Sequence, residues 1–496
     1  MRASASRSLA RSPFGTSRAV TPFGTARVTP WAAACFAGSR FGAVVLAAAL
    51  LAAAAVVAPV AAQHVVPGQT APPARDGRIY EIVNDVSAAR IESDIRTLAG
   101  FGTRNTLSDT LSETRGIGAA RRWIKAEFDL ISAECGGCLE VSYQSSTVQA
   151  RPQGQEPRDV VVVNVIAILR GTTHPDHYVI MSGDIDSRAS NTWDFTTDAP
   201  GANDNASGMA GAIEAARVLT RHRYPKSIVL AGLAGEEQGL WGGAGMARQA
   251  REDGWTIEAV LNNDMIGNIE GVDGVINNTV FRVFSEPTPV TETEQQRRAR
   301  RTAGGEVDGE SRQLARYVDR ITNHYFTNLR SMMIYRLDRF GRGGHHRPFN
   351  DAGFPAIRIM EAHENYTRQH QNIRVQDGIA YGDVIEGVDF DYAAKLTGVN
   401  AAVLASLAWG PPPPQDVRIT GAVRPSATLR WAAPESAVVD GYRIYWRLTT
   451  EPQWTNWVYV GNVTEYTMNN LTIDNHLFGV AAVARDGNES VVVFPR

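Results

Sequence analysis

The stretch Ser227-Ile-Val-Leu-Ala-Gly-Leu-Ala-Gly-Glu-Glu-Gln-Gly239 joins an uninterrupted apolar run to a pair of adjacent acids. An apolar run of this length, bounded by glycines, predicts a strand that is buried on both faces. Glu236 and Glu237 then stand just past the carboxyl end of that strand. In an open α/β sheet such strand ends converge on one crevice, where ligands bind. The stretch therefore predicts a largely parallel sheet with a polar site at its edge.

Apolar runs of the same kind recur along the chain, and stretches with helical periodicity separate them. The expected strands cover residues 160–169, 178–182, 227–233, 259–263, 280–284 and 356–360. The expected helices cover residues 79–98, 117–132, 208–221, 243–253, 310–327 and 392–407. This alternation predicts an α/β fold with a mostly parallel, mixed sheet that helices cover on both faces. The arginine-rich residues 297–301 lie between acids, a pattern typical of a solvated insertion loop.

The composition changes at three places and predicts the domain organisation. Residues 1–62 are rich in arginine, serine and alanine, then apolar, and end in small residues, which predicts a cleaved signal peptide. An uncleaved anchor is the alternative, because the apolar run is about long enough to span a bilayer. Residues 63–409 hold the α/β domain, and the Gly-Pro-Pro-Pro-Pro of residues 410–414 is a stiff linker. Residues 415–496 show short alternating strands, which predict a small all-β sandwich.

Charge and cysteine usage narrow the class of protein. The net charge of −3 offers no argument for a nucleic-acid partner. Cys135 and Cys138 form a Cys-x-x-Cys that could serve redox chemistry or half of a zinc site. Because residues 63–496 contain no second cysteine pair, a local structural disulfide is the better interpretation. A disulfide fits an exported protein, either periplasmic or secreted.

Acids and one histidine follow the predicted strands in an order that suits a pair of metal ions. Asp204 lies between a tight turn and a helix, where it could bridge two ions or simply cap the helix. Adjacent acids such as Glu236 and Glu237 repel unless a cation lies between them, so one can bind metal while the other accepts a proton. Asp264 ends the strand over residues 259–263, and His346 offers an imidazole ligand.

These motifs, with Ser182-Gly-Asp-Ile-Asp-Ser187, resemble the family-28 metallopeptidases, which include bacterial leucyl aminopeptidases and glutamate carboxypeptidase II. The resemblance covers about residues 79–407. It implies that Asp204 bridges two zinc ions, that Glu237 and His346 complete one site, and that Asp264 joins the other. It also implies that Glu236 is the general base.

The chain departs from the family pattern at two positions. Asp184 stands where the family has a metal-binding histidine, and His345 stands where the family usually has an acid. Asp186 is expected to orient a ligand from behind. A second site made only of oxygens would be less selective for zinc and could accept Mn²⁺ or Mg²⁺. We therefore expect one or two metal ions.

The resemblance also implies a reaction. An exported, metal-dependent exopeptidase is expected, most simply an aminopeptidase that cleaves peptide or protein substrates. Tyr366 is a candidate donor to the tetrahedral oxyanion, and its alternative is a packed tyrosine. Two other functions stay open: a single-zinc acyltransferase of the glutaminyl-cyclase kind, and a non-catalytic binding protein. Residues 415–496 resemble a fibronectin type III module and could contact a cell surface or polysaccharide.

Overall fold

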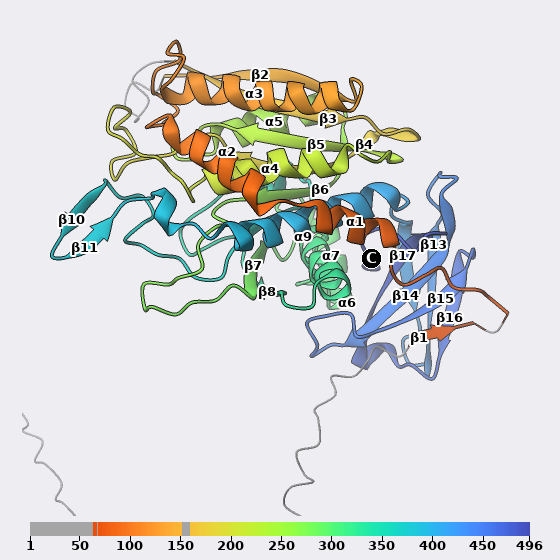
Figure 1. Cartoon of the computed structure of the whole chain (residues 1–496). Coiled ribbons are helices and arrows are strands. Elements are labelled where there is room, and N and C mark those ends of the chain that lie inside the picture. Colours follow the sequence, from red (N-terminus) through yellow and green to blue (C-terminus); the bar gives the residue numbers. More distant parts are fainter. Residues whose placement is uncertain (1–62, 67, 151–158) are drawn as a thin grey trace, which may run out of the picture. The chain divides into compact units, whose positions relative to one another are not determined.

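The structure is a computed structural model that describes residues 63–66, 68–150 and 159–496 (Figure 1). The expected signal peptide, residues 1–62, lies outside the described residues. In the part of the chain that is described, none of the helices is both long and apolar enough to cross a membrane. Two 3₁₀ turns complete the helical structure: η1 (Ile385–Gly387) and η2 (Ile473–Asn475).

An eight-stranded sheet with the order β2-β3-β5-β4-β6-β9-β7-β8 forms the centre of the α/β domain. Strands β5, β4, β6 and β9 run parallel, as do β7 and β8, whereas the pairs β2–β3, β3–β5 and β9–β7 are antiparallel. The predicted mostly parallel, mixed sheet is therefore confirmed. The strands are β2 (Leu139–Val148), β3 (Val160–Leu169), β4 (His174–Asp184), β5 (Lys226–Leu233), β6 (Thr256–Asn263), β7 (Val280–Ser285), β8 (Arg330–Ile334) and β9 (Ala356–Glu361).

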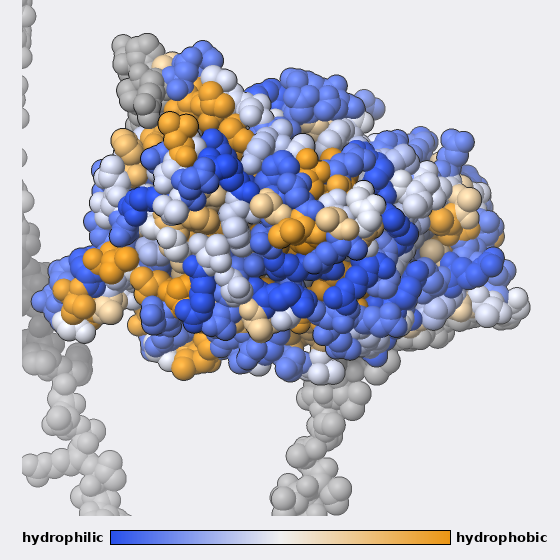
Figure 2. Space-filling model, turned by 45° about the horizontal axis from the view of Figure 1, so that its top comes forward, coloured by the Kyte–Doolittle hydropathy of each residue, from blue (hydrophilic) through white to orange (hydrophobic). Residues whose placement is uncertain are grey.

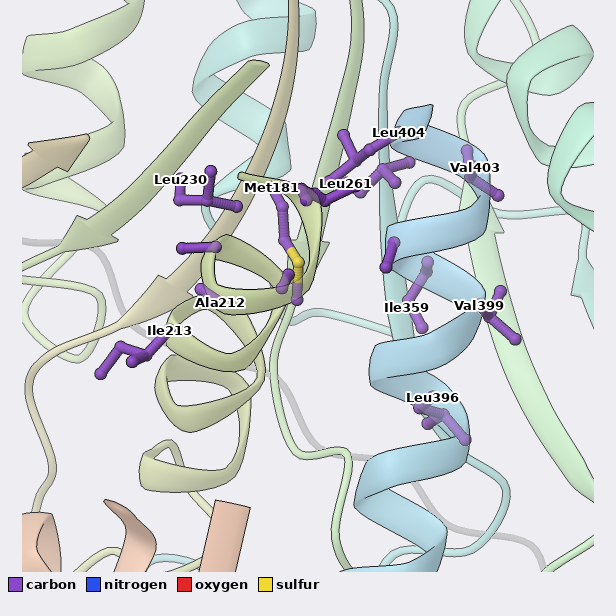
Figure 3. Close-up of a cluster of buried hydrophobic side chains, with 14 of the residues drawn as sticks. Met181, Ala212, Ile213, Leu230, Leu261, Ile359, Leu396, Val399, Val403 and Leu404 are labelled. Carbon is purple, nitrogen blue, oxygen red and sulfur yellow. The ribbon is translucent and has the colours of Figure 1, made fainter. Parts of the chain in front are cut away.

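Helices cover both faces of this sheet because alternate residues of its central strands point to opposite sides and both sets are apolar. In β5, Ile228 and Leu230 pack with α4 and α9, whereas Val229 and Ala231 pack with α5. Figure 3 shows the first of these cores, with Leu230 on the side of α4 and with Met181 and Leu261 between it and the side chains of α9. The helices are α1 (Gly77–Asp85), α2 (Ala88–Gly100), α3 (Gly116–Glu134), α4 (Ala206–Leu219), α5 (Trp241–Glu252), α6 (Glu294–Ala303), α7 (Glu310–Tyr325), α8 (His346–Asp351) and α9 (Phe390–Trp409).

Two expectations about local structure are wrong. The single helix expected over residues 79–98 is two helices, because Val86 is extended and the Ser87 side chain caps α2 by accepting from the Arg90 amide. The loop expected over residues 297–301 lies inside α6, which Thr293 opens with a capping box. Arg300 of that helix is buried against Glu292.

Beyond α9 the chain forms two antiparallel sheets, which confirms the predicted all-β region. One sheet contains β12 (Gln415–Thr420), β13 (Ser426–Ala432) and β16 (Glu465–Asn469), and the other contains β15 (Asn456–Gly461), β14 (Val439–Leu448) and β17 (His476–Ala484). Side chains of both sheets, such as Leu429 and Ile444, share one core. The sequence did not predict β1 (Gln63–Val65), which pairs in parallel with β15. At the end of α3, Cys135 is joined to Cys138 by a disulfide.

Candidate metal centre

Acidic side chains gather where the parallel strands β4, β5 and β6 end. Asp184 ends β4, Glu236 and Glu237 follow β5, and Asp264 follows β6. Since these strands are neighbours in the sheet, their ends meet at one edge, as the sequence predicted. Asp204, Glu236, Glu237 and Asp264 line a pocket of about 570 Å³ at this edge.

The three side chains that can hold a metal ion together are Asp204, Glu237 and His370. One donor atom from each lies within 4.8 Å of the other two, and no other such group occurs among the described residues. The His370 Nε2 atom is 3.0 Å from Asp204 Oδ2 and 3.3 Å from Glu237 Oε1. Two carboxylates and one imidazole form a ligand set that zinc uses when it keeps a fourth position open. These residues therefore fit a divalent metal ion.

Electrostatics supports the same conclusion. Although burial lowers the pKa of His370, the carboxylates of Glu237 and Asp204 raise it to about 10. The proton on His370 thus neutralises part of the surplus negative charge between the three side chains. A divalent ion would supply more positive charge at the same place and leave the imidazole neutral, the form in which it binds metal.

The structure places His370, not the expected His346, beside Asp204 and Glu237. His346 opens α8, is fully buried, and has its Nε2 atom 2.8 Å from the Leu337 carbonyl oxygen. His370 lies past β9, whose carboxyl end reaches the same edge of the sheet as β6. The position after β9 was the signal in the sequence that could have identified His370.

Asn205, rather than Asp204, caps α4. The Asn205 side-chain oxygen accepts from the Gly208 amide at 3.0 Å, which leaves the Asp204 carboxylate free to face His370. The backbone amide of Asp204 donates to Asp383 at 2.6 Å, so that a buried acid fixes this turn. Sequence reasoning left the helix-cap alternative open for Asp204 and did not find Asp383.

Glu236 stands next to Glu237, and the Asp186 carboxylate holds the backbone of both. The amides of Glu236 and Glu237 both donate to this carboxylate at 3.2 Å. Burial, together with the Asp264 and Glu237 carboxylates, raises the pKa of Glu236 well above its ordinary value. A carboxylate with a raised pKa holds a proton more readily, as a general base must.

Asp184 and Asp264, the residues expected at a second metal, have other partners. Asp184 Oδ1 is 2.6 Å from His345 Nδ1, and Asp184 Oδ2 accepts from the Asn205 amide at 2.7 Å. Asp264 Oδ2 lies 2.7 Å from a guanidinium nitrogen of the fully buried Arg358. Burial raises the pKa of Asp184 to about 8 and that of Asp264 to about 7, and neighbouring acids add to both shifts. Each oxygen of Asp184 thus already has one buried partner.

Tyr366 does not lie at the pocket. Its side chain is 56% exposed and it is not among the residues that line the pocket. Tyr366 belongs to the loop between β9 and His370. It is close to the site in sequence, but its ring does not turn inward. The pocket is lined by basic residues as well as acids: Arg188, Arg339, Arg342 and Arg347.

Comparisons with known proteins identify the family to which this chain belongs. The sequence profile described as Peptidase family M28 matches residues 164–377. A probable zinc metalloprotease of Leptosphaeria maculans is 41% identical over 425 residues, which cover 85% of this chain and 98% of that protein. Another from Pyrenophora tritici-repentis is 38% identical, with the same coverage. Among solved structures, the LapA aminopeptidase of Legionella pneumophila aligns with a TM-score of 0.49 and 17% identity, covering 69% of this chain and 77% of that one. The chain therefore belongs to peptidase family M28.

Proposed function

We propose that this protein is an exported, zinc-dependent exopeptidase that acts as an aminopeptidase. One observation carries the proposal: Glu236 stands directly beside the group formed by Asp204, Glu237 and His370, in an open pocket. A metal-dependent hydrolase needs a metal-binding group and a proton acceptor within reach of the same substrate. The probable zinc metalloproteases similar to this chain support zinc as the ion.

The chain's own residues divide the work as follows. Asp204, Glu237 and His370 would hold the ion, which supplies a Lewis acid for the substrate carbonyl and makes water more acidic. Glu236 accepts the proton of the attacking water and then gives it to the leaving amine. Asp186 accepts from the backbone amides of both glutamates and so fixes the turn that carries the metal-binding Glu237 and the proton acceptor Glu236.

The charges of the pocket favour short peptides with two free ends. The carboxylate of Glu236 can accept from an amino terminus, and the arginines that line the same pocket offer positive charge to a carboxylate. Arg339 and Arg342 are aligned by Glu364, which accepts from each of them at 3.0 Å. A peptide that spans the pocket can therefore meet opposite charges at its ends.

Apolar side chains lie next to this pocket. The hairpin of β10 (Arg374–Gln376) and β11 (Ile379–Tyr381) starts four residues after His370 and projects from the domain (Figure 1). It exposes Val375 and Ile379, and the same projection carries orange patches at the left of Figure 2. We include this hairpin in the proposal as a rim that accepts apolar substrate side chains.

A second candidate is an acyltransferase of the glutaminyl-cyclase kind. The observation in its favour is that the described residues offer one metal-binding group rather than two. Such an enzyme would cyclise an N-terminal glutamine and leave the rest of the peptide intact. Hydrolysis and cyclisation therefore give different products from the same peptide.

Export and the role of the C-terminal module are parts of the proposal that rest on the sequence. The pattern of residues 1–62 and the disulfide between Cys135 and Cys138 support export. N-terminal sequencing of the mature protein tests it, and a start near Gln63 is expected. The module formed by β12–β17 is proposed to contact a surface protein or polysaccharide, which a pull-down with cell-wall material would test.

The deciding experiment compares one short peptide in four forms: free, N-acetylated, C-amidated and with N-terminal glutamine. An aminopeptidase releases the first residue of the free peptide and loses activity on the N-acetylated form. We expect slower cleavage of the amidated peptide, because it lacks the carboxylate. Cyclisation without cleavage would favour the acyltransferase. A protein that contains no transition metal and converts none of the peptides would instead be a binding protein.

A further inference from the structure

We infer that this centre binds a single metal ion and that the guanidinium of Arg358 replaces the second ion of a paired-metal site. The inference rests on the proposed function, which requires the first ion at Asp204, Glu237 and His370. It differs from the pattern of the family that the sequence resembles, in which two ions share the bridging acid. The reason lies in how the remaining acids of the centre are already bound.

Each oxygen of Asp184 already has a buried partner that holds the carboxylate in place. His345 Nδ1 contacts one of its oxygens at 2.6 Å, and the Asn205 amide donates to the other at 2.7 Å. Both partners are fully or almost fully buried. Asn205 also caps α4 and donates to the Asn263 carbonyl at 2.7 Å, so moving it would disturb a helix and the end of β6. Asp184 therefore serves the scaffold.

Asp264 already has a cation beside it. Arg358, in the middle of β9, has a fully buried side chain, and one of its terminal nitrogens lies 2.7 Å from Asp264 Oδ2. The other terminal nitrogen donates to the Gly343 carbonyl at 2.6 Å and to Asp338 at 3.2 Å. Arginine stays protonated in proteins, so this positive charge is permanent. A metal ion next to Asp264 would be repelled by it.

The remaining donors are too few for a second ion. With Asp184 engaged, the second position keeps only Asp204 and Asp264, and Asp204 also serves the first ion. Two carboxylates beside a fixed guanidinium do not make the ligand set of a second metal. At the second position, Asp184 therefore stands where the family has a metal-binding histidine. The buried cation Arg358, rather than a second metal ion, neutralises Asp264. Arg358 is a positioning residue, because it lies behind Asp264 and does not line the pocket.

The metal content of the purified protein tests the inference directly. Elemental analysis after dialysis in metal-free buffer should find one zinc ion per chain. Calorimetric titration of the metal-free protein with zinc, and separately with manganese, should show one tight site each. Two sites of similar affinity in the unaltered protein would overturn the inference.

Substitutions at the two positions test separately how Arg358 and Asp184 affect the number of bound ions. Asp184→His restores the family residue but leaves Arg358 in place, so one ion per chain is still expected. Arg358→Lys keeps the positive charge and should also bind one. The double variant Asp184→His/Arg358→Met removes the cation and supplies the missing ligand, and it should bind two. Arg312→Met is the matched control, since Arg312 is also fully buried but donates to Ser285, away from the acids of the centre.

Two outcomes would overturn the inference: two ions per chain in the single variant Asp184→His, or one ion per chain in a folded double variant. If circular dichroism finds the double variant unfolded, the unaltered protein and Asp184→His decide. Failure of the proposed function looks different: one ion per chain without peptide conversion would leave this inference standing. Two ions per chain together with aminopeptidase activity would contradict this inference and leave the proposed function standing.

Discussion

Two buried clusters of opposite charges can be compared within this chain. At the metal centre, the acids Asp184, Asp204, Glu236, Glu237 and Asp264 face one fully buried cation, Arg358. Between the α/β domain and the C-terminal module, one acid faces two cations. There Asp308 accepts from Arg316 of α7 at 2.7 Å and from Arg447 of β14 at 2.9 Å, and all three side chains are almost completely buried.

The balance of charge determines what each cluster can do. A buried charge is costly unless it is paired, so an acid whose oxygens are both held by arginines has no capacity left for a metal ion. Asp308 uses both of its oxygens on arginine, which suits a structural link. The metal centre keeps a surplus of acid, and burial together with this surplus raises the pKa of Glu236 and Asp264. A surplus that side chains do not neutralise is what a metal ion requires.

The largest expected effect is loss of the metal ion. His370→Ala removes the only imidazole of the ligand group, so zinc content and peptide hydrolysis should both fall to background. His346→Ala is the matched control, because that ring contacts the Leu337 carbonyl instead. It should retain zinc, at some cost in stability. Elemental analysis of both variants measures this, and zinc loss in His346→Ala alone would reverse the assignment.

Glu236→Gln should lower turnover by about a hundredfold or more, because it keeps the size of the side chain and removes the proton acceptor. Zinc content should not change, since Glu236 is not part of the ligand group. Steady-state kinetics with the free peptide measures the effect. Glu214→Gln is the control: Glu214 is fully buried and binds Arg90 and Arg217, so its loss should affect stability rather than turnover. An unchanged rate in Glu236→Gln would remove Glu236 from this role.

Breaking the Asp308 cluster should lower the stability of the protein and leave its metal binding unchanged. Asp308→Ala leaves Arg316 and Arg447 buried without a counter-charge, which should cost about 3–5 kcal/mol in the free energy of unfolding. The zinc content of the folded protein should stay the same. Urea unfolding followed by fluorescence measures the change, with Asp308→Asn as an intermediate case that keeps the shape. A loss of zinc in Asp308→Ala would mean that the two clusters are not independent.

The sequence predicted the layers of the fold well because apolar runs report burial. The run over residues 160–169 became β3 with the same bounds. Boundaries that depend on a side chain binding the backbone were harder, and the break at Ser87 between α1 and α2 was missed. The pairing of β1 with β15 was also missed, because three residues carry too little pattern to reveal a partner almost four hundred positions away.

At the site, the sequence identified the acids but not every partner. Strand order predicted that Asp204, Glu236, Glu237 and Asp264 would converge, because each of them follows a strand that ends at the same edge of the sheet. Which histidine reaches the acids depends on the path of a loop, and a sequence pattern does not determine that path for His370. Arg358 left a clearer signal: an arginine inside a buried strand needs an acidic partner, and the expected strand over residues 356–360 contained it.

The smallest effect is expected at an exposed ion pair, which water and salt screen. Glu140 of β2 accepts from Arg170 at 3.1 Å, and both side chains are more than a third exposed. Glu140→Gln should therefore cost roughly 0.2–1 kcal/mol in the free energy of unfolding at neutral pH.

The hydrogen bond from Arg170 lowers the pKa of Glu140 below its ordinary value of 4.5. The contribution is thus complete above pH 4.5 and is lost as the pH falls through the lowered pKa of the folded state. Urea unfolding of both proteins at neutral and acidic pH, with and without added salt, measures this. A cost as large as that of Asp308→Ala would show that burial is not what separates these pairs.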